Sequence, residues 1–327
     1  MKFNNYMTGI KTTGTPHIAN ILSVINPTIL YINKYKKKKF FILIADLHSI
    51  TNYNNKNILI NNIYNTISVW LSFLNFNFKK NNIYFYRQSD IKEITELFWY
   101  LNCFFPFNRL KLSHVFKNNK NNNINTGIIN YPILMASDIL LYDINYVIIG
   151  KDQIQHIEFT RKIAKIINSK INSNLFKLPN YKIIYNKIIP GIDGNKMSKS
   201  NNNIINIFEN KTILENQIMN IKTNNKFISY NNFKSTILYK LYKIITNKEE
   251  IIYLKEKIKN NKIGYYNIKK KLYNYILKFY SKERKKFNYY INNINIIKKI
   301  LYINYKKIKY ISKKKIYNIK NKLGLKI

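Results

Sequence analysis

The first 200 residues alternate between short apolar runs and longer stretches in which apolar residues lie three and four positions apart. The runs at 40–45, 83–86 and 146–149 are almost continuously apolar or aromatic, which is typical of strands buried on both faces of a sheet. Residues 58–73 and 91–101 have the periodicity of amphipathic helices. Because strands alternate with helices, the pattern predicts a parallel sheet with right-handed crossovers.

The strand pattern stops near residue 205. From there on, apolar residues at helical spacing are interleaved with Lys and Tyr, which predicts helices without strands. Residues 118–125 are almost all Asn and Lys and are expected to form a loop. We therefore predict an α/β fold in which a parallel-sheet domain over residues 1–204 precedes an all-helical domain over residues 205–327.

The charge of the chain is extreme. Its 327 residues include 56 Lys and Arg against 15 Asp and Glu, a formal net charge of +41. Such a charge favours a polyanionic partner such as nucleic acid. However, the abundant residue types (Lys, Asn, Ile, Tyr and Phe) are also those that A/T-rich codons encode, so genome composition accounts for most of the excess without any role in RNA binding.

Cysteine content and hydrophobicity limit the possible environment. Cys103 is the only cysteine, which excludes an intrachain disulfide and a Cys-based zinc site and fits a cytoplasmic protein. The longest apolar run, 40–45, is too short to span a membrane. A signal peptide is not expected, because a loop with functional character already begins at Thr8.

Two loops about 180 residues apart carry the strongest chemical signals. Lys196-Met197-Ser198-Lys199-Ser200 follows a Pro-Gly-Ile-Asp-Gly turn, and its two ammonium groups are suited to offset the charge of a departing pyrophosphate. The turn-rich segment 8–17 opens onto an apolar helix, whose first N–H groups and His17 are candidate phosphate donors. Alone, a lysine pair in a basic protein or a histidine at a helix start is more often without such a role.

Two further segments lie between these loops. Residues 131–141 form an apolar helical pattern that is interrupted by Asp138, and a buried carboxylate needs a donor. For an isolated Asp, a capping contact is the ordinary explanation. Residues 150–156, Gly-Lys-Asp-Gln-Ile-Gln-His, follow the strand at 146–149, and ligands collect at such strand ends. His156 has no evident co-ligands for a metal, so a structural role is expected.

Together these segments resemble the tryptophanyl-tRNA synthetases, a family of class I aminoacyl-tRNA synthetases, from about Thr8 to Asn203. Segment 12–20 resembles the family's His-Ile-Gly-His loop, and 196–200 matches its Lys-Met-Ser-Lys-Ser loop. The resemblance implies a Rossmann-like catalytic domain over residues 1–204 with a dimerisation insertion at about 80–130. It also implies a helical anticodon-binding domain over residues 205–327 and a homodimer.

The activity implied by the resemblance is that of a tryptophan–tRNA ligase. The carboxylate of L-tryptophan attacks the α-phosphate of ATP, which carries Mg²⁺, and tryptophanyl-adenylate then transfers its amino acid to tRNA(Trp). Because a carboxylate is already a nucleophile, the first step needs positioning and electrostatics rather than a general base. Neither a protein-bound metal nor an organic cofactor is expected.

The resemblance also implies roles for individual residues. Lys196, Lys199 and His17 are the expected catalytic residues. The ATP-binding residues that it implies are Lys11, Thr12, Thr13, Ala19, Asn20, Lys117, Gly150, Lys151, Asp152, Ile189, Lys196, Met197, Ser198, Lys199 and Ser200. The tryptophan-binding residues that it implies are Met7, Tyr131, Met135, Asp138 and Gln153, with Asp138 accepting the indole N–H. Ala19 stands where the family has Gly beside the adenine, which predicts weaker ATP binding.

Two alternatives remain open from the sequence. The first is a tyrosyl-tRNA synthetase, from the family nearest to the tryptophanyl-tRNA synthetases. Such an enzyme needs a site suited to a phenol, and the Met135 and Asp138 pair argues against it. A catalytically decayed RNA-binding relative is suggested by Ala19, the Asn runs and the weaker resemblance of the last third. The intact segments 150–156 and 196–200 argue against such decay.

Overall fold

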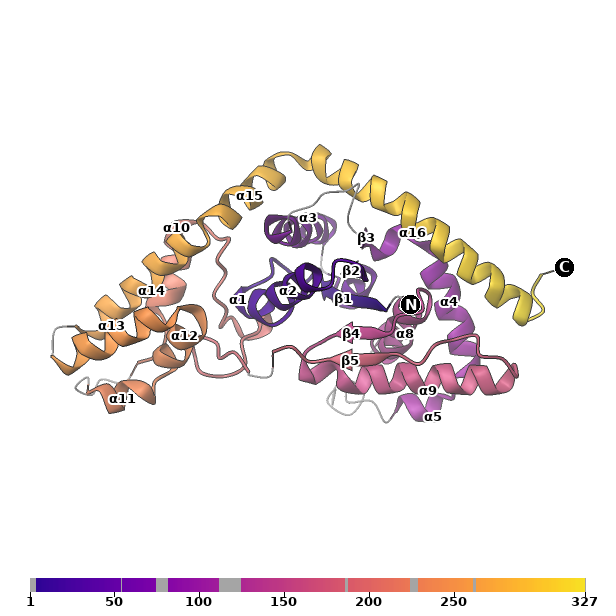
Figure 1. Ribbon diagram of the computed structural model, residues 1–327, viewed down its shortest axis with the longest axis horizontal. Coiled ribbons are helices and arrows are strands. Elements are labelled where there is room, and N and C mark those ends of the chain that lie inside the picture. The colour runs from indigo at the N-terminus through magenta and orange to yellow at the C-terminus, as the bar shows by residue number, and fades with distance from the viewer. Residues whose placement is uncertain are drawn as a thin grey trace.

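The structure is a computed structural model that describes residues 4–53, 55–74, 82–111, 125–185, 188–223, 229–260 and 263–326. Figure 1 shows a central sheet with helices on both faces and a group of helices to one side. The last two helices arch from that group over the sheet to the opposite end of the molecule.

Five parallel strands form the sheet in the order β3-β2-β1-β4-β5. The strands are β1 (Asn5–Lys11), β2 (Lys39–Ala45), β3 (Ile83–Arg87), β4 (Tyr146–Ile148) and β5 (Asn180–Lys182). Strands β2 and β3 lie on one side of β1, and β4 and β5, which come later in the chain, lie on its other side. The strand order therefore reverses between β1 and β4, and in open α/β sheets the ligand crevice lies at the carboxyl ends of the strands beside such a point.

In the described residues, helices connect and follow the strands. Before residue 204 they are α1 (Ile18–Asn20), α2 (Asn26–Lys34), α3 (Lys56–Phe73), α4 (Lys92–Phe104), α5 (Phe107–Leu110), α7 (Thr126–Ile129), α8 (Tyr131–Leu140) and α9 (Ile154–Lys170). After residue 204 they are α10 (Lys211–Met219), α11 (Tyr230–Lys234), α12 (Ile237–Ile245), α13 (Lys248–Lys259), α14 (Tyr265–Phe279), α15 (Ser281–Asn292) and α16 (Ile294–Lys322). Short 3₁₀ turns follow three strands: η2 (Leu47–Asn52), η3 (Gln88–Asp90) and η4 (Lys151–Gln153).

The sheet separates two hydrophobic cores. In β2, Ile42 and Ile44 join the core with α1, α3 and the C-terminal helices, whereas Phe41 and Leu43 join the core with α4, α8 and α9. All four side chains are nearly inaccessible, and burying each contributes about 1.5–3 kcal/mol. The continuous apolar run at 40–45 is the consequence of this burial on both faces.

A single helical path runs from α1 into α2 through the π-helical turn η1 (Ile21–Ile25). Pro27 lies at the start of α2, directly after this turn. In a regular α-helix its ring meets the carbonyl of Ser23, and the wider turn relieves that clash. The N-terminal loop directly precedes α1, the first part of this helical segment.

Helix α16 covers the free edge of the sheet. Figure 1 shows it crossing above β3 and reaching α4. The buried Asn304 accepts a hydrogen bond from the backbone N–H of Phe85 in β3 at 3.3 Å. Lys315 pairs with Asp143 at 2.6 Å, at the turn that follows α8. The last helix therefore covers an edge strand and pairs one of its backbone N–H groups, which protects an edge that is otherwise open to pairing.

The predicted fold class and its three predicted strands are confirmed, as are helices at 58–73 and 91–101. Three features were not predicted. Strand β1 was missed because its residues 8–11 were assigned to the turn-rich segment 8–17. Strand β5 escaped notice because its three residues are exposed or half-buried at the sheet edge and carry no apolar run. The return of α16 onto β3 was also missed, because helical periodicity does not reveal which surface a helix covers.

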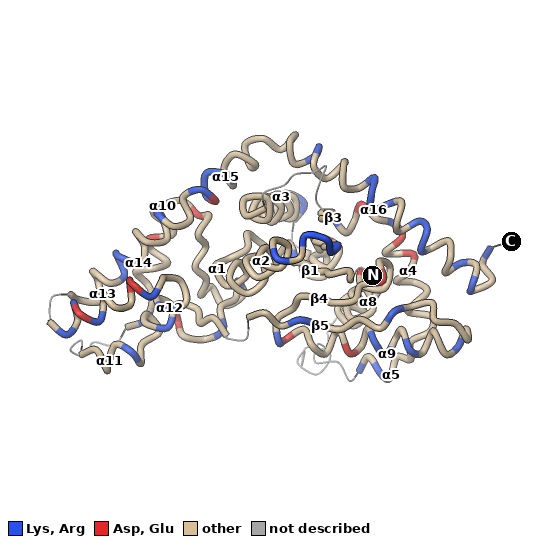
Figure 2. The backbone as a smooth tube through the Cα atoms, in the orientation of Figure 1, with Lys and Arg blue, Asp and Glu red and all other residues tan. Residues whose placement is uncertain are grey.

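The basic residues are spread widely over the chain. Figure 2 shows Lys and Arg on α9, on α16 and on the helices after residue 204, and also in the turn before β2. This spread agrees with a compositional origin for most of the charge. Across the described residues, each helix is too short or too polar to cross a lipid bilayer.

Candidate active site

The candidate site lies where the sheet order reverses. Lys11 ends β1, and Gly150 follows β4 on the neighbouring strand. The 3₁₀ turns η2 and η3 continue β2 and β3 at the same edge. Parallel strands bring their carboxyl ends together, so the predicted segments 8–20, 131–141 and 150–156 meet here.

Asp138 is almost fully buried, at 2% exposure, and is held by two side chains that sequence reasoning did not find. Gln88 donates from Nε2 to both carboxylate oxygens, at 3.0 and 2.9 Å. Nε2 of His48 lies 3.1 Å from Oδ2. Burial raises the pKa of Asp138, and the bonds from His48 and Gln88 oppose that rise. The carboxylate is therefore fixed in place by donors on two other strand ends.

This arrangement leaves one acceptor position on the carboxylate. A carboxylate offers about four lone-pair sites. Oδ2 faces both His48 and Gln88, whereas Oδ1 faces Gln88 alone. An ionised Asp138 has no proton to donate, so Nε2 of His48 carries the proton in this contact. A single further N–H donor can thus be accepted at Oδ1.

Tyr131 lies between the Asp138 cluster and the end of β1. Its ring is 4.3 Å from the ring of His48 and 5.3 Å from that of His156, measured between centroids. The ammonium group of Lys11 lies 4.1 Å above the Tyr131 ring, which is the geometry of a cation–π contact. Burial lowers the pKa of Lys11 to about 8.

The N-terminal loop and the lysine loop touch. Gly14 has φ +127°, and a Cβ built on it lies 3.1–3.3 Å from the side chain of Lys199. Only glycine combines this backbone angle with that close approach. Burial, and then the charge of Lys199, lower the pKa of His17 to about 4, so its imidazole is neutral at pH 7. Burial also lowers the pKa of Lys199 to about 8.

The helix start after this loop does not offer all the N–H groups that we expected for phosphate. The N–H of Ile18 donates to the carbonyl of Ile205 at 2.9 Å, and the N–H of His17 donates to Oδ1 of Asn20 at 3.1 Å. Both donors are satisfied within the protein. Asn20, which we expected to bind ATP, therefore caps its own helix in this structure.

The second lysine of the loop contacts the β4 strand end. Nζ of Lys196 lies 3.2 Å from Oδ2 of Asp152, and both side chains are more than half exposed. Burial raises the pKa of Asp152, but the ion pair with Lys196 outweighs it and the net pKa is lowered. A Cβ on Gly150 lies 2.7 Å from Oδ1 of Asp152, so glycine makes room for this carboxylate.

Buried backbone contacts anchor the lysine loop. Met197 is buried, and its N–H donates to the carbonyl of the buried Ile189 at 3.1 Å. Pro190 and Lys196 form an antiparallel bridge. Met197 and Ile189, both expected near ATP, thus belong to the hydrophobic core beneath the loop.

The other predicted site residues occupy several environments. Thr12 is buried and donates to Oγ of Ser49 from both its N–H and its hydroxyl at 2.9 Å. Met7 and Met135 belong to the core around α4, α8 and α9. The remaining predicted residues are exposed or half-buried at this edge. Thr13 and Ser198 lie on loops, Ala19 lies in α1, Lys151 and Gln153 lie in η4, and Ser200 lies in the 3₁₀ turn Lys199–Asn201. Lys117 lies outside the described residues.

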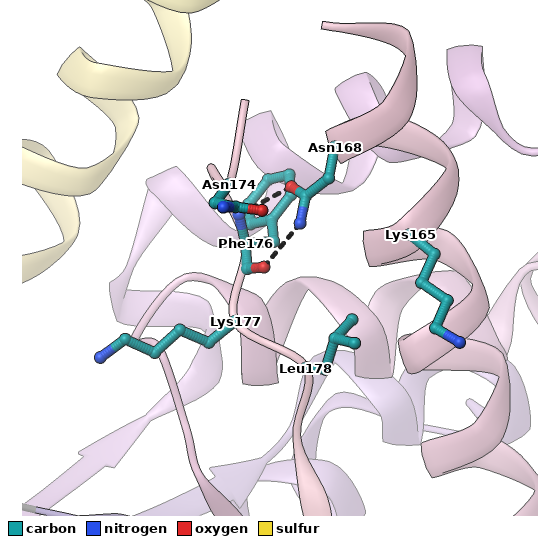
Figure 3. Close-up of a pocket in the computed structure, with 6 residues that line it drawn as sticks. All are labelled: Lys165, Asn168, Asn174, Phe176, Lys177 and Leu178. Atoms are coloured by element: carbon teal, nitrogen blue, oxygen red, sulfur yellow. Dashed lines mark hydrogen bonds between the residues drawn. The ribbon is translucent and has the colours of Figure 1, made fainter. Parts of the chain in front are cut away.

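Two cavities among the described residues are lined by side chains other than these. One of about 410 Å³ is lined by Lys165, Asn168, Asn174, Phe176, Lys177 and Leu178 (Figure 3). The amide of Asn168 is already paired there with the backbone of Phe176, at 2.9 and 2.8 Å. Another of about 370 Å³ lies beside Glu158 and Lys162. Within the described ranges, no three His, Cys, Asp or Glu side chains are arranged to hold a metal ion.

A family model and individual relatives match this chain. The model of the class I tRNA synthetases (W and Y) matches residues 2–281. A tryptophan–tRNA ligase of Fusobacterium nucleatum is 36% identical over 244 residues, which cover 74% of this chain and 73% of that protein. A tryptophan–tRNA ligase of Bordetella pertussis is 34% identical over 257 residues, which cover 74% of this chain but 56% of that protein.

Solved structures agree with the sequence matches. The tryptophanyl-tRNA synthetase of Campylobacter jejuni complexed with ADP and tryptophan superimposes with a TM-score of 0.89 at 30% identity, over 98% of this chain and 99% of that one. The tryptophanyl-tRNA synthetase of Mycoplasma pneumoniae has a TM-score of 0.79 at 23% identity, over 99% of each chain, and shows the shared fold.

Proposed function

The chain belongs to the class I tRNA synthetases of the W and Y family, and we propose that the strand-end site described above is where it activates tryptophan with ATP. Its reaction is that of the tryptophan–tRNA ligases: tryptophan and ATP give tryptophanyl-adenylate and pyrophosphate, and the tryptophanyl group then passes to tRNA(Trp). The observation that carries the proposed location is the contact between Lys199 and Gly14, because it unites the two loops best suited to hold a triphosphate.

In the proposed site, tryptophan occupies the space beside Tyr131 and Asp138. The indole N–H donates to Oδ1 of Asp138, the one carboxylate position that His48 and Gln88 leave open. Tryptophan has one side-chain donor and no acceptor, so a site with one free acceptor suits it. A phenylalanine side chain leaves that buried acceptor unpaired, which disfavours it strongly. Met7, Met135 and Gln153 complete the proposed pocket.

In the proposed site, the triphosphate of ATP lies along the N-terminal loop and the lysine loop, which touch at Gly14 and Lys199. Lys11 lies where the two substrates meet, because its ammonium group reaches Tyr131 from the end of β1. There it stabilises the α-phosphate as the tryptophan carboxylate attacks in line. Lys199 is aimed at the departing pyrophosphate, and neutral His17 donates a hydrogen bond to the same group. Mg²⁺ enters bound to the phosphates of ATP in this proposal.

The relatives and the site favour tryptophan over the two alternatives. A phenol both donates and accepts, but the open position at Asp138 only accepts. A decayed protein has no need to keep the Lys196–Asp152 pair at 3.2 Å or the glycines that admit Asp152 and Lys199. Gly14 and Gly150 are therefore best explained by a working site.

We place tRNA on the helices after residue 204, as an anticodon-binding domain over residues 205–327. Aromatic side chains are exposed there, among them Tyr266 at 67% and Tyr310 at 72%. Lysines lie over tyrosine rings on the same helices, as Lys271 does over Tyr253 at 4.0 Å. Exposed aromatic rings among cations are suited to stack on unpaired RNA bases.

We also propose that a second copy of the chain covers α4 and α5, within the expected insertion at about 80–130. Trp99 is 66% exposed and Phe107 54% exposed on these helices. Such large exposed apolar side chains on neighbouring helices favour a protein partner. Sedimentation velocity should show a dimer that the variant Trp99→Lys converts to a monomer, and a monomeric wild type contradicts this part of the proposal.

The proposed function is tested by tryptophan-dependent exchange of pyrophosphate into ATP. Exchange should require tryptophan, should fail with tyrosine, and should be reduced by at least about tenfold in Lys199→Ala. Transfer to tRNA(Trp) is then measured separately, with Tyr266→Ala as the variant expected to raise the KM for tRNA alone. Equal exchange with tyrosine contradicts the proposed specificity for tryptophan. The absence of exchange with either amino acid favours the alternative of a catalytically decayed RNA-binding relative.

A further inference from the structure

Asn203 lies at the base of the lysine loop and is 2% exposed, although it ends a run of three asparagines whose other members are exposed. Its Oδ1 accepts the N–H of Ser198 at 2.8 Å. Its Nδ2 donates to Oδ1 of Asp193 at 2.8 Å and to the carbonyl of Lys196 at 3.1 Å. One carboxamide thus joins both sides of the loop that presents Lys199.

The neighbouring backbone is shaped around this carboxamide. The N–H of Ile192 donates to the carbonyl of Asn203 at 3.0 Å. A Cβ on Gly191 lies 2.4 Å from both Cγ and Nδ2 of Asn203, closer than real contacts allow. Glycine at position 191 therefore leaves the space that the Asn203 side chain fills.

The same segment reaches the N-terminal loop. Two residues after Asn203, the carbonyl of Ile205 accepts the N–H of Ile18 at 2.9 Å. Residues 203–205 therefore contact both loops of the proposed ATP site, one through a side chain and the other through the backbone. Lys199, which lies against Gly14, belongs to the loop that Asn203 holds, and Gly14 belongs to the loop whose helix start bonds to Ile205.

We propose that Asn203 is a positioning residue that clasps the lysine loop and holds Lys199 against the N-terminal loop. It touches the backbone of Lys196 and Ser198, so it acts through the loop rather than on a substrate. This inference rests on the proposed function for its effect on catalysis. The clasp itself is a property of the unliganded chain and can be measured without substrates.

The first test compares Asn203→Ala with Asn201→Ala, a matched change at an exposed asparagine of the same run. Limited trypsin digestion without substrates, read by mass spectrometry, reports cleavage after Lys196 and Lys199. Cleavage should be about fivefold faster or more in Asn203→Ala and unchanged in Asn201→Ala, since proteolysis follows the population of the opened loop. Equal cleavage of Asn203→Ala and the wild type overturns the proposal.

The second readout is pyrophosphate exchange. Asn203→Ala should lower kcat by about tenfold or more, because a misplaced catalytic group loses its orientation. Equilibrium dialysis should find its affinity for tryptophan within about twofold of the wild type. Faster cleavage with a normal kcat keeps the clasp but removes the lysine loop from the proposed mechanism, so the two hypotheses fail separately.

A charge rearrangement distinguishes a clasp from mere packing. Asn203→Asp keeps an acceptor for Ser198 but faces the Asp193 carboxylate across the present 2.8 Å contact. It should therefore open the loop and slow exchange. Adding Asp193→Asn again sets one amide against one carboxylate and should restore part of both readouts. If Asn203→Ala does not fold, the comparison of Asn203→Asp with the double variant tests the proposal instead. A double variant whose cleavage and exchange rates equal those of Asn203→Asp contradicts the clasp.

Discussion

The side-chain amide of Gln88 donates to both carboxylate oxygens of Asp138, at 3.0 and 2.9 Å. Gln88 begins the turn after β3, and Asp138 lies on α8, so this contact ties a strand end to the helix that carries the proposed substrate-binding groups. His48 adds a third contact from the turn after β2. The carboxylate is thus held in one orientation, which in the proposed site lowers the cost of accepting an indole N–H.

Asp138→Ala should lower kcat/KM for tryptophan by more than about tenfold. A hydrogen bond to a charged group contributes roughly 1.5–3 kcal/mol, and about 1.4 kcal/mol corresponds to tenfold. The variant should also unfold more easily, because Gln88 and His48 lose their buried partner. Pyrophosphate exchange and urea denaturation measure the two effects. Glu158→Gln, an exposed carboxylate change on α9, is the control, and an unchanged kcat/KM for Asp138→Ala excludes the indole-acceptor role.

The sequence predicted that Asp138 is a buried carboxylate in need of donors, but it did not predict that His48 and Gln88 are those donors. A lone carboxylate inside an apolar helical pattern marks a buried charge that needs donors. Its donors lie 90 and 50 residues away in the chain, on turns whose local sequence gives no sign of a shared target. Only the parallel pairing of β1, β2 and β3 brings those turns to one edge.

The asparagine run at 201–203 gives a similar lesson. Composition explains why asparagines are frequent, and two of the three are exposed as that explanation expects. The third is buried and makes three hydrogen bonds within the lysine loop. In a sequence this rich in asparagine, the structural role of one asparagine therefore cannot be recognised from the sequence alone.

Lys199→Ala should lower kcat for adenylate formation by at least about tenfold with little change in tryptophan affinity. Charge on pyrophosphate grows only as its bond to the α-phosphate breaks, so a lysine aimed at it stabilises the transition state more than bound ATP. Lys196 is more exposed and pairs with Asp152, so Lys196→Ala should show more of its defect in the KM for ATP.

Pre-steady-state adenylate formation in both lysine variants and in the double variant distinguishes these roles. The two effects need not add, because both lysines act on one triphosphate. Asn201→Ala serves as the control for a change near the loop. A Lys199→Ala rate equal to that of the wild type at saturating ATP removes Lys199 from the mechanism.

The dependence of ATP use on pH should reflect Lys11 and Lys199. Burial lowers the pKa of each ammonium group to about 8. In the free protein both groups lose their protons as the pH rises through 8, so kcat/KM for ATP should fall above that value. Bound phosphates favour the protonated lysines, so kcat should be maintained to higher pH. Exchange rates from pH 7 to 10 measure both, and a flat kcat/KM up to pH 9.5 contradicts the prediction.

His17 should make the folded state sensitive to acid. Burial, and then the charge of Lys199, lower its pKa from 6.5 to about 4. Between these values the unfolded chain binds a proton at this imidazole and the folded chain does not, so stability is lost as the pH falls from 6.5 towards 4. The difference of pKa corresponds to about 3 kcal/mol. His17→Gln cannot titrate, so its free energy of unfolding should fall less over the same range. Urea denaturation at pH 7.0 and 4.5 measures this slope for both proteins, and equal slopes show that His17 does not titrate as a buried neutral imidazole.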